Sequence, residues 1–153
     1  STLSSSSAAS DVYKRQELAN DNVLSIVPTT DPVGKTCRDA VETQPALIVD
    51  GAVQNLSSWT EQNPRACLGQ SSRREMLLLV IEGHNLTEGI YGAALSECAQ
   101  ILTRHGAQQA VNLAGGTCAI LWYDGQCVTR CSNSYHTEGR LLPNAFVYHA
   151  RTD

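Results

Sequence analysis

The chain has 153 residues, 42% of them hydrophobic and 17% charged, with a formal net charge of -4 and a pI of about 5.5. This length corresponds to one domain and is enough for a hydrophobic core. The acidic balance and the lack of a basic cluster beyond Arg73-Arg74 exclude a nucleic acid or an anionic membrane as partner. A small molecule or a glycan is the expected ligand, and the oligomeric state stays open.

The longest apolar run, from Met76 to Ile81, is far shorter than the roughly 20 residues that cross a bilayer, so no membrane span is predicted. The six cysteines show neither a CxxC pair nor the Cys/His spacing of a zinc site. We therefore predict no metal site and no cofactor, and favour buried free thiols over disulfides. An extracellular destination would reverse that preference, and export or a cell-surface location stays open.

Residues 1–16 differ from the rest of the chain. They are polar, rich in serine and without a hydrophobic period, which is typical of a disordered tail. Residues 6–16, SSAASDVYKRQ, also resemble translated sequencing-adapter sequence at the edge of a metagenomic gene fragment. We exclude residues 1–16 from the fold prediction. If they are foreign, the true N-terminus is missing, and the lack of a signal peptide says nothing about localisation.

Residues 17–45 are expected to be a partial N-terminal portion of the domain, with a short apolar patch from Val23 to Val27. Gly34-Lys35-Thr36 looks like the end of a phosphate-binding loop. However, Thr29 stands where the first glycine of that motif belongs, and no strand is predicted to lead in. We therefore do not predict a nucleotide site there.

Two strands are predicted in the next part of the chain. Ala46 to Val49 is a short strand that turns at Asp50-Gly51 into Ala52-Val53 as a hairpin. After a polar connection, Met76 to Ile81 is an unbroken apolar run, typical of a strand buried on both faces.

A helix is predicted around Leu95, Cys98, Ala99 and Leu102, which recur at helical spacing before the stop at Gly106. The strand Ala110 to Leu113 follows, so we expect a strand-helix-strand crossover with both strands parallel in one sheet.

The Gly115-Gly116 turn then lies at a carboxyl end of a parallel strand, where open α/β sheets place ligands. A second hairpin turns at Asp124-Gly125, and Asn144 to His149 is the last predicted strand. Because strands outnumber helices, we predict an α+β fold with a mixed sheet.

Several short motifs follow one another in a characteristic order. They are Pro64-Arg65-Ala66-Cys67-Leu68-Gly69, Glu82-Gly83, Ser96-Glu97-Cys98-Ala99, Asn112-Leu113-Ala114-Gly115-Gly116, Asp124-Gly125 and Gly139-Arg140-Leu141-Leu142-Pro143-Asn144-Ala145. This order resembles the phosphodiester glycosidase family, which includes the lysosomal uncovering enzyme and bacterial and phage proteins described as exopolysaccharide-related. The resemblance covers about Ala46 to His149, so we assign residues 46–153 to the C-terminal part of that domain.

The resemblance implies hydrolysis of a sugar-1-phosphodiester, which releases the sugar and leaves a phosphomonoester. The family signature Asn-Leu-Asp-Gly-Gly matches four positions here, namely Asn112, Leu113, Gly115 and Gly116. Ala114 stands where the family carries the aspartate, and Glu82 stands where many members have aspartate. Thr117 and Cys118 replace the frequent Gly-Ser.

Because the resemblance implies a phosphodiester substrate, Arg65 is the first candidate to bind the phosphate, since a guanidinium group can bind two phosphate oxygens. Arg140 is the second, and either arginine could instead be an ordinary surface residue. Glu82 is the candidate catalytic acid, base or nucleophile.

Asn112 either hydrogen-bonds the substrate or pins the turn, and neither role excludes the other. The backbone of Gly115, Gly116 and Thr117 is expected to contact the phosphate.

Ala114 opens a second hypothesis. A methyl group transfers no proton, and loss of a positioned acid or base lowers a rate by about a hundred- to ten-thousandfold. The chain is therefore either an impaired phosphodiester glycosidase or a catalytically degenerate domain that binds a glycan phosphate. An interaction module of a cell surface or a phage is a third interpretation.

Overall fold

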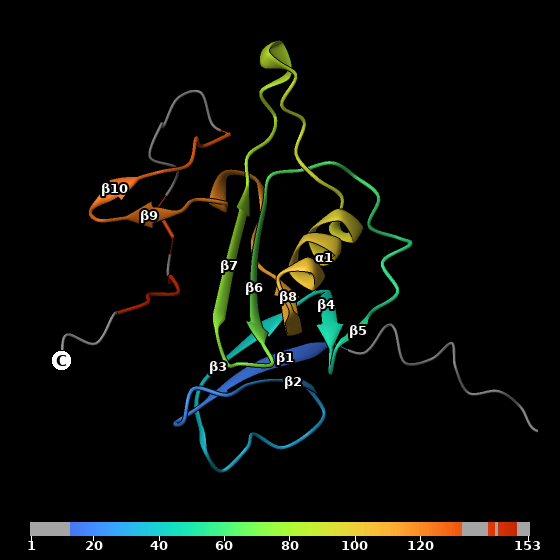
Figure 1. Cartoon of the computed structure of the whole chain (residues 1–153), viewed down its shortest axis with the longest axis vertical. Helices are drawn as coiled ribbons and strands as arrows, with labels where there is room; N and C mark the ends of the chain where they lie inside the picture. Colours follow the sequence, from blue (N-terminus) through green and yellow to red (C-terminus); the bar gives the residue numbers. More distant parts are fainter. Residues whose placement is uncertain (1–12, 133–140, 143, 150–153) are drawn as a thin grey trace, which may run out of the picture.

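The computed structural model describes residues 13–132, 141–142 and 144–149 of the chain (Figure 1). Its strands, α-helix and 3-10 helices (η) are, in chain order, β1 Lys14–Ala19, β2 Leu24–Pro28, β3 Cys37–Thr43, β4 Ala46–Val49, β5 Ala52–Val53, β6 Arg65–Ser71, β7 Met76–Ile81, η1 Leu86–Glu88, α1 Leu95–Arg104, β8 Ala107–Asn112, η2 Gly116–Cys118, β9 Trp122–Tyr123 and β10 Gln126–Cys127.

A five-stranded sheet with the order β5-β4-β8-β6-β7 forms the centre of the fold. Each pair of neighbouring strands in it is antiparallel. A three-stranded sheet, β2-β1-β3, and the two-stranded hairpin of β9 and β10 complete the described strands (Figure 1). None of the helices in the described part of the chain is long and apolar enough to cross a membrane.

The two faces of the five-stranded sheet pack against different layers. On one face, the buried side chains of α1 join those of the sheet, such as Ile48, Cys67 and Ala110, in one hydrophobic cluster. On the other face, Leu68 and Val111 pack with residues of the three-stranded sheet. Because side chains alternate along a strand, β6 and β8 are covered on both sides and form the core.

The helix α1 confirms the predicted periodicity. Its buried residues are the four predicted from the spacing, Leu95, Cys98, Ala99 and Leu102. The Glu97 carboxylate accepts a hydrogen bond from the Ala94 backbone N–H at 2.8 Å and so caps the N-terminus. Gly106, just past the helix, has a φ of 80°, the left-handed conformation that ends many helices.

Both predicted hairpins are present. Asp50 and Gly51 have φ values of 49° and 78°, and Asp124 and Gly125 have 49° and 72°. Two successive positive φ values are the pattern of the tight turn that matches strand twist. The strands β9 and β10 that flank the second turn have two residues each, and Cys118 belongs to η2 rather than to this hairpin.

The prediction of which strand is buried on both faces was wrong. The apolar run of β7 lies at the sheet edge and is only partly buried, with Leu78 44% exposed. The strand buried on both faces is β6, which was not predicted as a strand because its sequence, RACLGQS, mixes polar and apolar residues without a strand period. Its buried Gln70 is satisfied by the β1–β2 region, accepting from the Leu24 N–H at 2.8 Å and donating to the Asn22 carbonyl at 2.7 Å.

The α+β class fits the structure, but the predicted crossover differs in detail. Because β7 and β8 are each antiparallel to β6, they run in the same direction, yet β6 lies between them. They are therefore not hydrogen-bonded neighbours, and each pairing in the sheet is antiparallel. The rule that ligands bind at the carboxyl ends of parallel strands thus gives no support to the glycine turn as a site.

Differences also occur toward both ends of the chain. Lys14 to Gln16, assigned to the excluded tail, form the first half of β1, which pairs with β2 and β3. A strand, β2, does lead into the loop of Gly34, but a strand and not a helix follows it, so the loop still does not match a phosphate-binding loop. Asn144 to His149 form no strand and are exposed, because no neighbouring strand among the described residues pairs with them.

Candidate functional site

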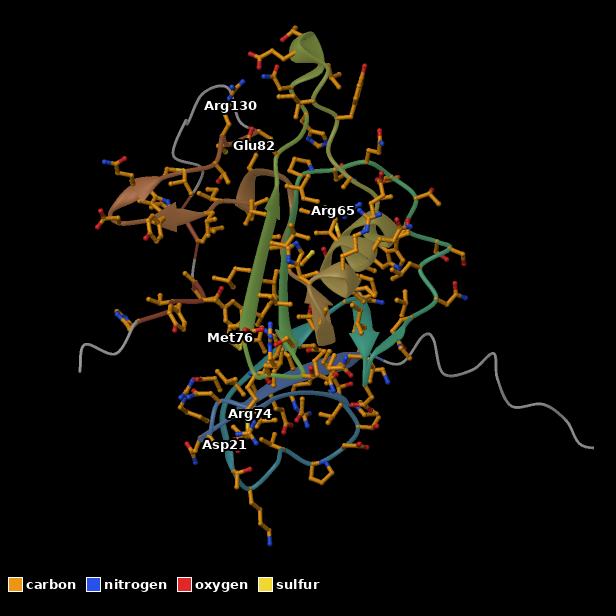
Figure 2. The ribbon with its side chains drawn as sticks, in the orientation of Figure 1. Asp21, Arg65, Arg74, Met76, Glu82 and Arg130 are labelled. Carbon is orange, nitrogen blue, oxygen red and sulfur yellow. The ribbon has the colours of Figure 1, made fainter. Side chains whose placement is uncertain are left out.

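The predicted site residues gather at one end of the five-stranded sheet. Since β6 is antiparallel to both β7 and β8, the start of β6 lies beside the ends of β7 and β8. Arg65 begins β6, Glu82 follows β7, and Asn112 ends β8. In Figure 2, Arg65 and Glu82 lie toward the upper end of these strands, whereas Met76, at the other end of β7, lies far below.

The glycine turn after β8 contacts Pro64, the residue that precedes β6. The Gly116 N–H donates to the Pro64 carbonyl oxygen at 3.0 Å, and the Leu113 N–H donates to the Ala66 carbonyl oxygen at 2.8 Å. A Cβ on Gly115 would lie 2.5 Å from the Pro64 oxygen, so only glycine fits. The motif around Arg65 and the motif around Gly115, distant in sequence, are therefore in direct contact.

Asn112 is buried, with 8% of its surface exposed, and pins the loop before β4. Its Nδ2 donates to the Gln44 carbonyl oxygen at 3.2 Å, and its backbone N–H donates to the Pro45 carbonyl oxygen at 3.1 Å. The Thr43 hydroxyl donates to the Asn112 carbonyl oxygen. The Oδ1 of Asn112 is buried without a hydrogen-bond partner. It is an unused acceptor at the end of β8.

Arg65 is also buried, and its guanidinium is partly used by the chain itself. Nε donates to the Ala93 carbonyl oxygen at 2.9 Å, and Nη2 donates to the Glu61 carbonyl oxygen at 2.7 Å. Nη1 has no hydrogen-bond partner among the described residues. Arg65 thus joins the loop before β6 to the loop before α1. Its Nη1 and its positive charge are available to bind an anion.

Glu82 lies in a partly exposed position and contacts a residue that sequence reasoning missed. Its Oε1 accepts a hydrogen bond from the backbone N–H of Arg130 at 2.7 Å. The Arg130 guanidinium pairs with Glu88 at 2.5 Å. Hydrogen bonds from Arg130 and Asn85 lower the pKa of Glu88, and Glu88 in turn raises the pKa of Arg130. Arg130 stands in no motif, so nothing in the sequence pointed to it.

The remaining predicted residues lie around the glycine turn, with one exception. Ala114 is exposed, and Thr117 is partly buried in η2. The Thr117 carbonyl oxygen accepts a hydrogen bond from the thiol of Cys131 at 3.8 Å. The second candidate phosphate ligand, Arg140, lies outside the described residues. Across residues 13–132, 141–142 and 144–149, no group of three or more His, Cys, Asp or Glu side chains is placed to hold a metal ion.

A family model described as "Phosphodiester glycosidase" matches residues 2–149. The chain belongs to the phosphodiester glycosidase family. This confirms the resemblance drawn from the order of the motifs. The match begins inside the segment predicted as a foreign tail. No curated protein matches the sequence.

Two solved structures resemble this member of the phosphodiester glycosidase family in fold. One is the zebrafish N-acetylglucosamine-1-phosphodiester alpha-N-acetylglucosaminidase catalytic domain, auto-inhibited by its pro-peptide, with a TM-score of 0.66 and 15% identity over 84% of this chain and 49% of that chain. The other is a hypothetical protein from Synechocystis, with a TM-score of 0.52 and 19% identity over 80% of this chain and 32% of that one. The chain therefore spans about half of the zebrafish domain.

Proposed function

We propose that the chain contains the substrate-binding and catalytic residues of a glycosidase that cleaves a sugar-1-phosphodiester, releasing the sugar and leaving a phosphomonoester. The family supports a glycosidase type of function. The observation that carries the specific proposal is the meeting of Arg65, Glu82, Asn112 and the glycine turn at one end of the sheet. The zebrafish relative is named for action on an N-acetylglucosamine-1-phosphodiester, which makes that ester the first substrate to test.

The chemistry of the bond sets what each residue contributes. A phosphate is a stable leaving group, so its release depends more on holding its negative charge than on protonating it. The buried charge and free Nη1 of Arg65 suit that task, with Arg140 as a second ligand. Asn112 is assigned the positioning of the turn at the end of β8, since its Nδ2 donates to the Gln44 carbonyl oxygen and its Oδ1 is buried.

Glu82 is assigned the proton transfer or the attack at the anomeric carbon. A carboxylate in that place either activates water or forms a covalent glycosyl intermediate, as carboxylates do in most glycosidases. In the structure its Oε1 holds the Arg130 backbone N–H, which keeps the side chain oriented.

Ala114 determines how active this site is. The family aspartate is missing, and the exposed methyl group leaves room for a carboxylate without displacing packed atoms. We therefore expect the chain to turn over slowly or not at all while it retains binding. The second candidate function, a degenerate domain that binds a glycan phosphate, is favoured by this substitution alone.

The test compares the wild-type chain with Ala114→Asp and with Ala114→Asp combined with Glu82→Gln. Each is incubated with a panel of sugar-1-phosphodiesters that includes the N-acetylglucosamine ester, and the released reducing sugar is measured. Restoring the carboxylate is expected to raise the rate by about a hundred- to ten-thousandfold, and Glu82→Gln to remove most of that gain.

Calorimetry with the corresponding sugar 1-phosphates separates the two functions. Binding to the wild-type chain with no turnover by it or by Ala114→Asp supports the degenerate binding domain. Neither binding nor turnover by either protein contradicts both functions.

A further inference from the structure

Among the described strands, β7 is a long and apolar sheet edge. Figure 1 shows it as the outermost strand of the five-stranded sheet, beyond β6. Its sequence, MLLLVI, has no charged residue and no proline, and each of its six side chains is at least partly exposed. The opposite edge, β5, has only two residues, and the edges of the three-stranded sheet carry the charges of β3 or the proline of β2. β7 therefore lacks the features that keep an edge strand from pairing with another chain.

The turn between β6 and β7 shows which backbone groups of β7 point away from β6. The Ser71 N–H donates to the Glu75 carbonyl oxygen at 2.9 Å, so these two residues face each other across the ladder. Bonded and non-bonded pairs alternate along an antiparallel ladder. The register of β6 and β7 therefore leaves the N–H and C=O groups of Met76, Leu78 and Val80 pointing outward.

The other end of the ladder agrees with this assignment. The Ala66 carbonyl oxygen accepts the Leu113 N–H from beyond β8, so the backbone of Ala66 faces away from its β7 partner, Val80. No backbone hydrogen bond from elsewhere in the described part of the chain reaches the outward groups of β7. They are free to bond to an added strand.

The side chains along this edge form a row with opposite charges at its two ends. Because side chains alternate along a strand, every second residue lies on one face: Arg74, Met76, Leu78, Val80 and Glu82. Met76 packs with the cluster between the two sheets, and Arg74 Nη1 lies 3.5 Å from Asp21 Oδ2 in the β1–β2 turn, so the row lies on the side of the three-stranded sheet. Figure 2 shows Arg74 and Glu82 at opposite ends of β7. The edge is thus positive at one end, apolar in the centre and negative at the other end.

We propose that β7 pairs with β7 of a second copy of this chain across a two-fold axis at Leu78. Antiparallel pairing about this axis places Met76 opposite Val80 of the second copy, so outward groups meet outward groups along the whole strand. It also places Arg74 opposite Glu82 of the second copy, and the symmetry repeats both pairs. The inference uses only the charge of Glu82 and does not depend on the proposed function.

Hydrogen bonding and charge together select this register. A two-fold axis at Leu77 would place Val80 opposite Arg74 of the second copy, and an axis at Leu79 would place Met76 opposite Glu82. Either shift sets a charge against an apolar side chain, whereas the axis at Leu78 joins opposite charges and apolar side chains. The present ion pair of Arg74 with Asp21 does not compete strongly, because both side chains are more than half exposed.

The first test measures the mass of the full chain by sedimentation velocity over a range of concentrations. We expect twice the chain mass of 16.5 kDa at high concentration. Leu78→Lys places two ammonium groups opposite each other on the axis and is expected to leave a monomer. Because Leu78 is 44% exposed, the fold should survive the change, which circular dichroism checks.

The matched control is Val53→Lys, on the other edge strand, where Val53 is 52% exposed and the dimer should persist. Wild-type protein that stays monomeric overturns the proposal and would leave the edge open to a strand of another protein. A dimer that survives Leu78→Lys also overturns it, because its interface must lie elsewhere.

The second test exchanges the charges at the two ends of the row. Arg74→Glu and Glu82→Arg each set like charges opposite each other at two places, so each variant alone should raise the dissociation constant of the dimer about tenfold. An equal mixture of the two variants should recover the wild-type constant, because every such pair then joins a positive to a negative side chain. The matched control is Arg73→Glu, an adjacent arginine outside the row whose side chain is 81% exposed, which should leave the constant unchanged. A mixture that dissociates as readily as the single variants would contradict the two-fold pairing.

Discussion

The candidate site has a buried half and an exposed half, which differ in what their polar atoms bind. The buried half is Arg65 and Asn112 together with Gly115, which is half-buried but packs against Pro64. The exposed half is the partly exposed Glu82 with the exposed Ala114 and Arg130. In the buried half, side chains and backbone bind main-chain atoms of other loops. In the exposed half, the contacts are surface hydrogen bonds and one surface ion pair. The fold therefore depends on the first group, whereas the second is free to change without unfolding the protein.

This difference would explain how a domain could keep its framework while alanine stands at position 114, where the family resemblance implies an aspartate. Replacing an exposed aspartate by alanine removes chemistry but few contacts, so it costs little stability. A change in the buried half would instead disturb the start of β6, the end of β8 and the loop that leads into β4. The predictions that follow test whether the two halves differ in this way.

The largest effect is expected at Gly115. Gly115→Ala places a methyl group 2.5 Å from the Pro64 carbonyl oxygen, so the turn must move away from the start of β6. We expect a loss of about 3 kcal/mol in the free energy of unfolding, measured by urea denaturation. The control is Gly116→Ala, which meets no atom within 4 Å but has a φ of 61°, so it should lose only about 1 kcal/mol. Equal losses would show that the contact with Pro64 is unimportant.

Arg65 should follow in size. Arg65→Met keeps an unbranched apolar side chain but leaves the carbonyl oxygens of Ala93 and Glu61 without their donors. We expect a loss of about 2 kcal/mol in the free energy of unfolding. Arg73→Met is the matched control, because the Arg73 side chain is 81% exposed and its removal should change stability by no more than about 0.5 kcal/mol. A loss as small for Arg65 as for Arg73 would place Arg65 with the exposed half.

Asn112 should have a smaller effect on stability. Asn112→Ala removes the hydrogen bond to the Gln44 carbonyl oxygen, which is neutral and 3.2 Å long, and also removes an acceptor that is already unpaired. We expect a loss of about 1 kcal/mol in the free energy of unfolding, since losing the unpaired Oδ1 offsets part of the cost. A loss above that for Arg65→Met would mean that Asn112 holds more of the fold than its contacts account for.

The sequence predicted the elements that are specified by short-range patterns, in which residues a few positions apart decide the local structure. The α1 spacing and the Asp-Gly turns are local signals, and both appear as predicted. The burial of a strand is different, because it depends on neighbours far along the chain. β6 contains Arg65, Gln70 and Ser71 and is still buried, because two layers cover it. β7 is apolar throughout, yet it lies at the edge of the sheet.

The same reasoning separates what was predictable in the candidate site. The order of motifs pointed to Arg65, Asn112 and the glycine turn before their contact was known. Their common position follows from the antiparallel pairing of β6 with β8, which no local pattern reveals. The contact of Arg130 with Glu82 depends on how the segment after β10 returns to β7, so only the structure identifies it.

The smallest effect is expected from the ion pair of Arg130 and Glu88 in the exposed half. The pKa of Glu88 is lowered in the folded chain below its ordinary value of 4.5, chiefly by the hydrogen bond from Arg130. A lowered pKa in the folded state stabilises the protein above the ordinary value, and that contribution disappears as the pH falls through the folded pKa. Because both side chains are largely exposed, the contribution is small even at neutral pH.

The measurement compares Tm for the wild-type chain and Glu88→Gln between pH 7 and pH 3. We expect a Tm of the variant slightly below that of the wild type at pH 7, and the difference should vanish at the acid end and in 1 M salt. Glu42→Gln is the control, because Glu42 is exposed on β3 and forms no ion pair with another of the described residues. A difference that persists both at pH 3 and in 1 M salt would mean that the Glu88 side chain stabilises the loop through packing. The exposed half would then contribute to the stability of the fold as the buried half does.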